Sequence, residues 1–157
     1  VTINSLLLRP KSRGRVRLRS ADSNDLPLVD PRIFEDPADL QETMAGFRFA
    51  RSVLAQTPMK ELIEREIYPG PEVVSDDGIA DHCRRTVKTG YHPVGTCRMG
   101  GEDDPMAVLD PELRVRGTQG LRVIDVSMMP NIVSGNTNAA ALAVGDKAAS
   151  LILSRPM

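Results

Sequence analysis

The sequence has few of the residues that build metal sites and disulfide scaffolds. Among its 157 residues there are two histidines, two cysteines and no tryptophan. Cys83 and Cys97 are not a CxxC pair, and His92 with Cys97 lacks a third ligand at useful spacing. We therefore predict no bound metal and expect both thiols to be reduced, as in a protein without a disulfide framework.

Excess charge and long apolar runs are also missing. The net charge is −1, which gives no general attraction to nucleic acid or to an anionic membrane. No apolar run reaches the length of a membrane span, and the arginines of residues 9–15 follow the first short apolar run, unlike a secretion signal. We expect a cytoplasmic location, no nucleic-acid partner and no membrane span.

The glycine-rich motifs that cradle phosphates do not occur. Neither GxGxxG nor GxxxxGK[ST] is present, and the sequence has no GxSxG nucleophile elbow. This chain alone therefore lacks the usual device for binding a dinucleotide, and hydrolysis by a serine nucleophile is a weak interpretation.

The residues that are present predict one domain with a hydrophobic core, because 41 % of them are hydrophobic. Asp36 and Pro37 are typical of a helix N-terminus, and Ser75 begins a second capped helix that Gly90 can close. The remaining expectations for residues 1–120 are a hairpin of strands 5–9 and 15–19, a loop over 20–35, a short helix over 59–67, and short strands at 108–110 and 113–116.

The last third predicts a ligand crevice. Residues 121–126 suggest a strand buried on both faces, with Asp125 at its end. A loop rich in Gly, Pro and Asn follows, and then an Ala-rich helix over 138–154 with Asn138 as its cap. Since a helix N-terminus carries unpaired N–H groups and partial positive charge, we expect an electron-rich group there.

His92 is the candidate for proton chemistry, because it follows a glycine in a loop and imidazole exchanges protons near neutral pH. Ser127 or Thr96 could pair with it as a nucleophile. His82 lies inside a predicted helix, where a surface or half-buried structural role is the simpler interpretation.

Four segments, in this order, resemble the C-terminal part of glucose–methanol–choline (GMC) oxidoreductases, most of all the choline dehydrogenase-like branch. Residues 12–22 resemble the first strands of the same region, and residues 37–88 match only in general pattern. The four segments are Tyr91–Gly100 (YHPVGTCRMG), Val108–Gly117 (VLDPELRVRG), Leu121–Pro130 (LRVIDVSMMP) and Ser134–Ala139 (SGNTNA).

The resemblance implies an α+β fold: an antiparallel sheet with helices on one face, plus a final strand and helix that complete an FAD domain. Residues 1–120 would be mainly the substrate-binding part, and residues 121–157 the strand, loop and helix of the FAD site. The N-terminal FAD-binding domain of the family is absent from this sequence. We therefore expect the chain alone to bind no FAD and to be inactive. We also expect it to expose apolar surface, which favours self-association into a homo-oligomer.

The same resemblance implies the chemistry, which is hydride transfer from a small-molecule alcohol to N5 of FAD. By position the catalytic pair is His92 and Asn136. His92 would accept the hydroxyl proton, or share it and stabilise the developing alkoxide, and Asn136 would hydrogen-bond the same oxygen. The cofactor would be contacted by Asp125 and Val126 at the strand end and by the backbone of Thr137 and Asn138 at the helix start.

Two alternatives stay open. One is a non-catalytic, self-associating scaffold domain, and the other is a hydrolase that uses Ser127 or Thr96 with His92. The identity of the alcohol cannot be read, although a quaternary ammonium group would want an aromatic cage and the chain has only two tyrosines and three phenylalanines.

Overall fold

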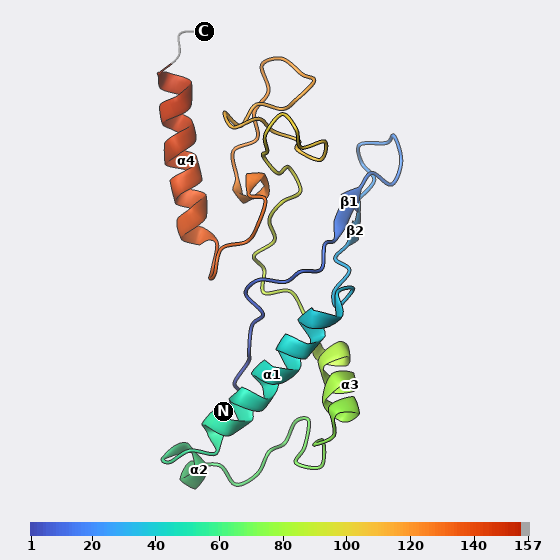
Figure 1. Cartoon of the computed structure of the whole chain (residues 1–157), viewed down its shortest axis with the longest axis vertical. Helices are drawn as coiled ribbons and strands as arrows, with labels where there is room; N and C mark the ends of the chain where they lie inside the picture. The colour runs from blue at the N-terminus through green and yellow to red at the C-terminus, as the bar shows by residue number, and fades with distance from the viewer. Residues whose placement is uncertain (155–157) are drawn as a thin grey trace. The chain divides into compact units, whose positions relative to one another are not determined.

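The computed structural model describes residues 1–154 and divides the chain into two compact units, residues 1–88 (unit 1) and residues 89–157 (unit 2). Residues 155–157, at the end of the predicted 121–157 segment, lie outside the described part. The elements, labelled in Figure 1, are β1 (Arg15–Arg17), β2 (Leu28–Asp30), α1 (Pro37–Leu54), α2 (Met59–Leu62), α3 (Asp76–Thr86), the 3₁₀ helix η1 (Val126–Met128) and α4 (Asn138–Leu153).

The sheet of unit 1 has two antiparallel strands, β1 and β2, with Val16 opposite Val29. The predicted hairpin of strands 5–9 and 15–19 is therefore wrong, because residues 15–17 pair forward with 28–30, which we expected to be loop. Alternation of polar and apolar residues indicates a strand, but it does not identify the strand with which it pairs. Gly14 permits the close approach, since a Cβ there would lie 2.5 Å from the Asp30 carbonyl oxygen.

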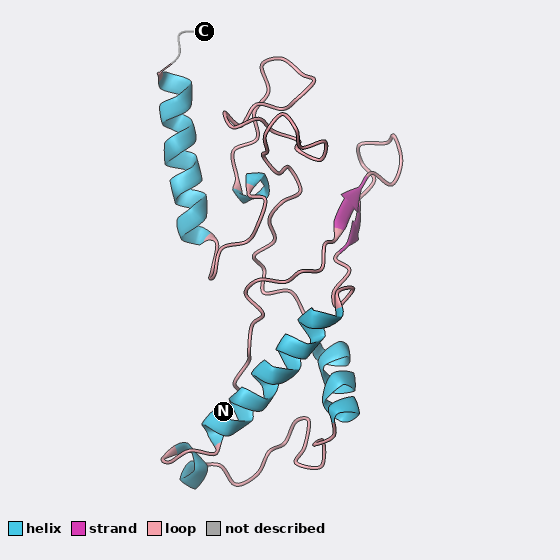
Figure 2. Cartoon of the chain, in the orientation of Figure 1, coloured by secondary structure: helices cyan, strands magenta, loops and turns pink. Residues whose placement is uncertain are grey.

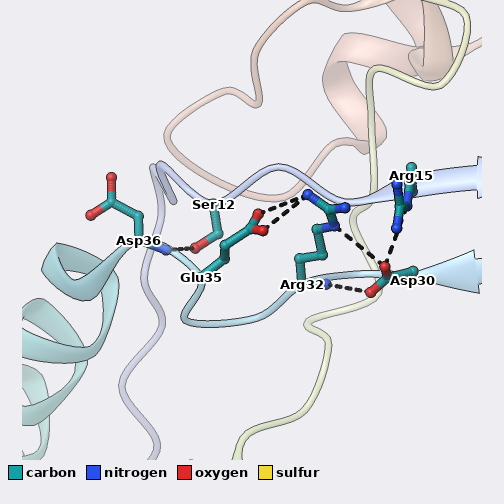
Figure 3. A network of polar contacts seen from close by, with 6 residues as sticks. All are labelled: Ser12, Arg15, Asp30, Arg32, Glu35 and Asp36. Carbon is teal, nitrogen blue, oxygen red and sulfur yellow. Dashed lines mark hydrogen bonds and ion pairs between the residues drawn. The ribbon is translucent and has the colours of Figure 1, made fainter.

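A polar network joins the sheet to the start of α1 (Figure 3). Arg32 donates to Asp30 and to Glu35, and Arg15 pairs with the same Asp30 carboxylate at 3.5 Å. The Asp36 amide donates to the Ser12 hydroxyl at 3.0 Å. These contacts fix the turn between β2 and the first helix.

The two longer helices of unit 1 begin where the sequence predicts. The Asp36 carboxylate accepts from the Ala38 amide, and the Ser75 hydroxyl accepts from the Gly78 amide. α3 ends at Thr86, capped by Val87, so the expectation that Gly90 closes it is wrong. α2 is shorter than expected. Helices α1 and α3 enclose the core of this unit, which consists of Leu40, Met44, Ile79, Ala80 and Cys83.

Turns and loops make up most of unit 2 (Figure 2). Its buried cluster includes Leu109, which is 0 % exposed. The strands expected at 108–110 and 113–116 reduce to single bridges, in which Leu109 pairs with both Met99 and Val115. Leu113, Met128 and Ala148 complete the buried cluster. Backbone bonds between irregular segments thus replace a regular sheet here.

The strand predicted over 121–126 does not form. Arg122 makes one bridge, to Arg114, and Val126 begins η1. A strand buried on both faces needs backbone hydrogen bonds to a neighbouring strand along its whole length. Within residues 121–126, the bonds to another described segment end at Val123, whose amide donates to the Leu113 carbonyl. Ile124 is 37 % exposed as a result. The α+β class is confirmed, with a two-stranded antiparallel sheet and without this final strand.

The final helix is present as α4, but Asn138 is its first residue rather than its cap. Thr137 takes the cap position and makes no side-chain cap bond, because its hydroxyl is engaged elsewhere. Ala148 is buried, whereas Leu142 is 69 % exposed. The apolar composition of this helix predicts that it is buried, and that prediction is wrong for these described residues, because only one face of α4 packs on the Leu109 cluster.

Candidate active site

The loop that carries His92 is fixed by two backbone hydrogen bonds to η1 (Val126–Met128). The Cys97 amide donates to the Ser127 carbonyl at 3.1 Å, and the Met99 amide donates to the Met128 carbonyl at 2.8 Å. Gly95 has φ +89°, a value that L side chains rarely adopt. The loop therefore has a defined path through a turn that favours glycine.

Thr137 contacts the half-buried His92 ring from the start of α4 (residues 138–153). Its hydroxyl oxygen lies 3.1 Å from His92 Nδ1, and its amide donates to the same nitrogen at 3.5 Å. Thr137 is itself 7 % exposed. The contact joins residues 45 positions apart in the chain and fixes one edge of the imidazole ring.

Asn136, the second predicted catalytic residue, immediately precedes Thr137 and is exposed. The contact of His92 with Thr137 therefore brings the imidazole to the short segment that carries the Asn136 amide. The structure thus unites the two loops from which the pair was predicted. An imidazole and a carboxamide together offer donors and acceptors to one polar atom of a ligand.

Asp125 lies at the other predicted cofactor position, just before η1. Its carboxylate accepts a hydrogen bond from the Ser127 amide at 2.7 Å. The side-chain and backbone hydrogen bonds with Ser127 lower the pKa of Asp125 against the opposing effect of burial. The exposed carboxylate is therefore an anion at neutral pH, able to accept from hydroxyl groups. Val126, half-buried, is the first residue of η1.

These groups fit a ligand with hydroxyl groups and an electron-rich edge, as FAD has. The exposed Asp125 carboxylate can accept from ribityl or ribose hydroxyls. Asn138 is exposed at the N-terminus of a 16-residue helix, where the first amides have no intrahelical partner and the dipole favours negative charge. Among residues 1–154, no group of three or more His, Cys, Asp or Glu side chains could hold a metal ion.

The side-chain role of Thr137 was not predicted; only its backbone was singled out. A threonine before a helix is an ordinary cap in a sequence, and nothing local indicates a histidine 45 residues earlier. The hydroxyl that lies within hydrogen-bond distance of His92 Nδ1 belongs to Thr137. It belongs neither to Ser127 nor to Thr96, the two nucleophiles considered for a hydrolase.

His82 has a structural environment in α3 of unit 1. Its ring packs on Phe47 and Tyr68, with centroid distances of 5.2 and 5.1 Å. Burial, followed by the charges of Arg85 and Arg51, lowers the pKa of His82. His82 is therefore a half-buried structural residue of α3, as the sequence predicts.

Comparison with known proteins establishes the family. Residues 10–145 match the C-terminal profile of the GMC oxidoreductases. The chain is 47 % identical over 152 residues to the alcohol dehydrogenase [acceptor] of Pseudomonas putida, and 50 % identical over 146 residues to the choline oxidase of Arthrobacter globiformis. These alignments cover 97 % and 92 % of this chain. The chain belongs to the GMC oxidoreductase family.

Solved structures of other oxidoreductases have the same fold over most of this chain. The pyridoxine 4-oxidase of Mesorbium loti superposes with a TM-score of 0.87 at 33 % identity, over 96 % of this chain and 29 % of that one. An FAD-dependent oxidoreductase from Chaetomium thermophilum gives a TM-score of 0.86 at 33 % identity, over 92 % of this chain and 25 % of that one.

The chain spans 27 % of the length of both curated relatives. Within residues 1–154, no helix combines the length and the apolar character required to cross a membrane.

Proposed function

We propose that the natural full-length protein carrying this chain is an FAD-dependent alcohol oxidoreductase, and that this chain supplies its catalytic pair, His92 and Asn136. The observation that carries the proposal is the contact of His92 with Thr137, because it brings the imidazole to the segment that carries Asn136. The relatives named as an alcohol dehydrogenase and a choline oxidase support this reaction class.

Bound FAD supplies the acceptor for the hydride that leaves the alcohol carbon. On this chain, Asp125 would accept from cofactor hydroxyls, next to Val126, the first residue of η1. The backbone amide of Asn138, at the positive end of α4, would face the electron-rich edge of the cofactor, while the Thr137 amide beside it donates to His92 Nδ1.

His92 and Asn136 act on the substrate oxygen. Hydrogen bonds between these two side chains and the alcohol orient its C–H bond in one direction, and they favour negative charge on the oxygen as the carbon is oxidised. The half-buried ring limits access of water on one side. The substrate class is a small-molecule alcohol; the aromatic content gives this chain few walls for a quaternary ammonium cage.

The test is anaerobic reduction of bound flavin by a panel of alcohols, followed by absorbance in the natural full-length protein. We expect His92→Ala to slow bleaching of the flavin band by roughly 10²-fold or more, because a positioned imidazole contributes about 10²- to 10⁴-fold. The matched control is His82→Gln in α3, since His82 is the only other histidine of this chain and packs on Phe47 and Tyr68.

Equal bleaching in wild type and His92→Ala would remove His92 from the reaction. A well-folded full-length protein that holds no flavin would contradict the oxidoreductase proposal itself and leave the self-associating scaffold as the better account.

A further inference from the structure

We propose that Thr137 is the positioning residue for His92: it fixes the imidazole ring and selects the tautomer with the proton on Nε2. The inference rests on the proposed function for its catalytic meaning, but the contact on which it depends belongs to the folded chain alone.

Two groups of Thr137 meet the same ring nitrogen. The hydroxyl oxygen is 3.1 Å from His92 Nδ1, and the backbone nitrogen is 3.5 Å from it. A backbone N–H can only donate, whereas a hydroxyl can donate or accept. A hydrogen on Nδ1 would oppose the amide hydrogen directed at it. Nδ1 is therefore the acceptor, and in the neutral ring the proton is on Nε2.

The contact between Thr137 and His92 restricts the orientation of the imidazole ring. Thr137 is buried although Asn136 and Asn138 on either side are exposed, so water competes little for its hydroxyl. Its carbonyl accepts from the Ala141 amide at 2.9 Å, which ties Thr137 into the first turn of α4. The ring is thus attached to a 16-residue helix rather than to a free loop.

This assignment decides between the two roles that the family resemblance left open for His92. With Nδ1 occupied by Thr137, the ring nitrogen available to a substrate is Nε2, and it carries a hydrogen. In this tautomer His92 donates a hydrogen bond to the substrate oxygen and stabilises negative charge there, so the hydroxyl proton passes to solvent water and not to this ring. The Asn136 amide can donate to the same oxygen, so the pair acts as two hydrogen-bond donors.

The direct test is the tautomer of His92, measured by two-bond ¹H–¹⁵N correlation of ring-labelled histidine in the natural full-length protein. The pH should be about 8.5, well above the usual imidazole pKa of ~6.5. The signals of His92 are those that vanish in His92→Gln. We expect a protonated Nε2 and an unprotonated Nδ1 in the wild type. A proton on Nδ1 would overturn the inference.

Substitutions separate the hydroxyl from other effects. Thr137→Val keeps the shape and removes the hydroxyl, so we expect the Nε2–H to Nδ1–H ratio to fall by roughly 5-fold or more, as for the loss of one hydrogen bond. Thr137→Ser restores the hydroxyl and should restore the ratio. Thr118→Val is the matched control, because the Thr118 hydroxyl bonds the Val115 carbonyl instead. An unchanged ratio in Thr137→Val would contradict the positioning role.

Flavin reduction then links the contact to catalysis. Thr137→Val should slow reduction by roughly 5- to 20-fold, with Thr137→Ser within about 2-fold of wild type, since one hydrogen bond to the ring is lost and then regained. If the protein oxidises no alcohol but the tautomer is as assigned, the proposed function fails and the positioning contact stands. If alcohols reduce the flavin but Nδ1 carries the proton, only this inference fails.

Discussion

The two units of this chain are stabilised in different ways. Unit 1 (residues 1–88) contains two paired strands and three helices, and its core lies between α1 and α3. In unit 2 (residues 89–157), the described residues form α4, one 3₁₀ helix and irregular segments joined by single bridges. All the predicted site residues lie in unit 2. Regular elements thus stabilise one unit, while backbone bonds between loops shape the candidate site in the other.

The largest effect should come from the core of unit 2. Leu109→Ala should lower the free energy of unfolding by about 2–5 kcal/mol, because the side chain is fully buried and its removal leaves a cavity under the loops. Chemical denaturation monitored by circular dichroism measures the loss. Leu142→Ala on the exposed part of α4 is the control, with a change within about 0.5 kcal/mol. Similar losses at both positions would show that Leu109 does not hold the loops.

In unit 1 a buried carboxylate should be the most sensitive polar group. Asp39 accepts from the amides of Lys11 and Ser12, both at 2.8 Å, and so ties the N-terminal segment to α1. Asp39→Asn should destabilise the protein by about 1.5–3 kcal/mol at pH 7, as for hydrogen bonds to a charged group. Denaturant titration of both proteins gives the difference, and Asp25→Asn on the exposed turn is a control in the same unit. A loss as small as the control's would contradict the role of Asp39.

The same carboxylate predicts a pH dependence. Burial acts to raise the pKa of Asp39, but the hydrogen bonds from Lys11 and Ser12 outweigh it, so the pKa is lowered in the folded state. Its stabilising contribution is complete above the unfolded value of about 3.9 and is lost as pH falls through the folded pKa. The difference in unfolding free energy between wild type and Asp39→Asn should therefore shrink between pH 5 and about pH 3. A constant difference would disagree with this linkage.

A smaller effect is expected in the loop that carries His92. Gly95→Ala should cost about 1–2 kcal/mol, since φ +89° is unfavourable for an L side chain. An added Cβ would meet the Met129 carbonyl oxygen at 3.4 Å, an ordinary contact, so the cost comes from the backbone. Thermal unfolding measures it, with Gly101→Ala as the control because open space surrounds that position. Equal shifts would contradict the conformational argument.

The smallest effect belongs to a helix cap. Ser75→Ala removes the hydroxyl that accepts from the Gly78 amide, so we expect a loss of about 1 kcal/mol. Ser75→Asp keeps an acceptor and should stay close to wild type. Thermal unfolding of the three proteins checks this, and a stable Ser75→Ala protein would show that α3 does not depend on its cap.

Local signals in the sequence predicted the helices of unit 1. Asp36 with Pro37, and Ser75 before two aspartates, are cap patterns that act within one turn. Strand pairing was not predictable in the same way, because the partner of residues 15–17 lies across a long turn and alternation does not identify it. The expected strand at 121–126 failed for a related reason: a buried apolar pattern does not provide the ladder that a strand requires.

For the candidate site, the sequence indicated His92 and Asn136 through the family resemblance. The contact of His92 with Thr137, which joins residues 45 positions apart, brings the imidazole ring to the segment that carries Asn136. No local pattern indicates that contact. The cofactor positions Asp125, Val126, Thr137 and Asn138 stay predictions that rest on charge, exposure and the helix N-terminus.

The measurement that tests the central claim most directly compares one variant from each unit in the natural full-length protein. Stopped-flow flavin reduction by an alcohol and thermal unfolding are recorded for wild type, His92→Ala and Ser75→Ala. We predict that His92→Ala slows reduction by roughly 10²-fold or more with little change in Tm, while Ser75→Ala lowers Tm and leaves the reduction rate unchanged. Reduction at the wild-type rate in His92→Ala would contradict the account.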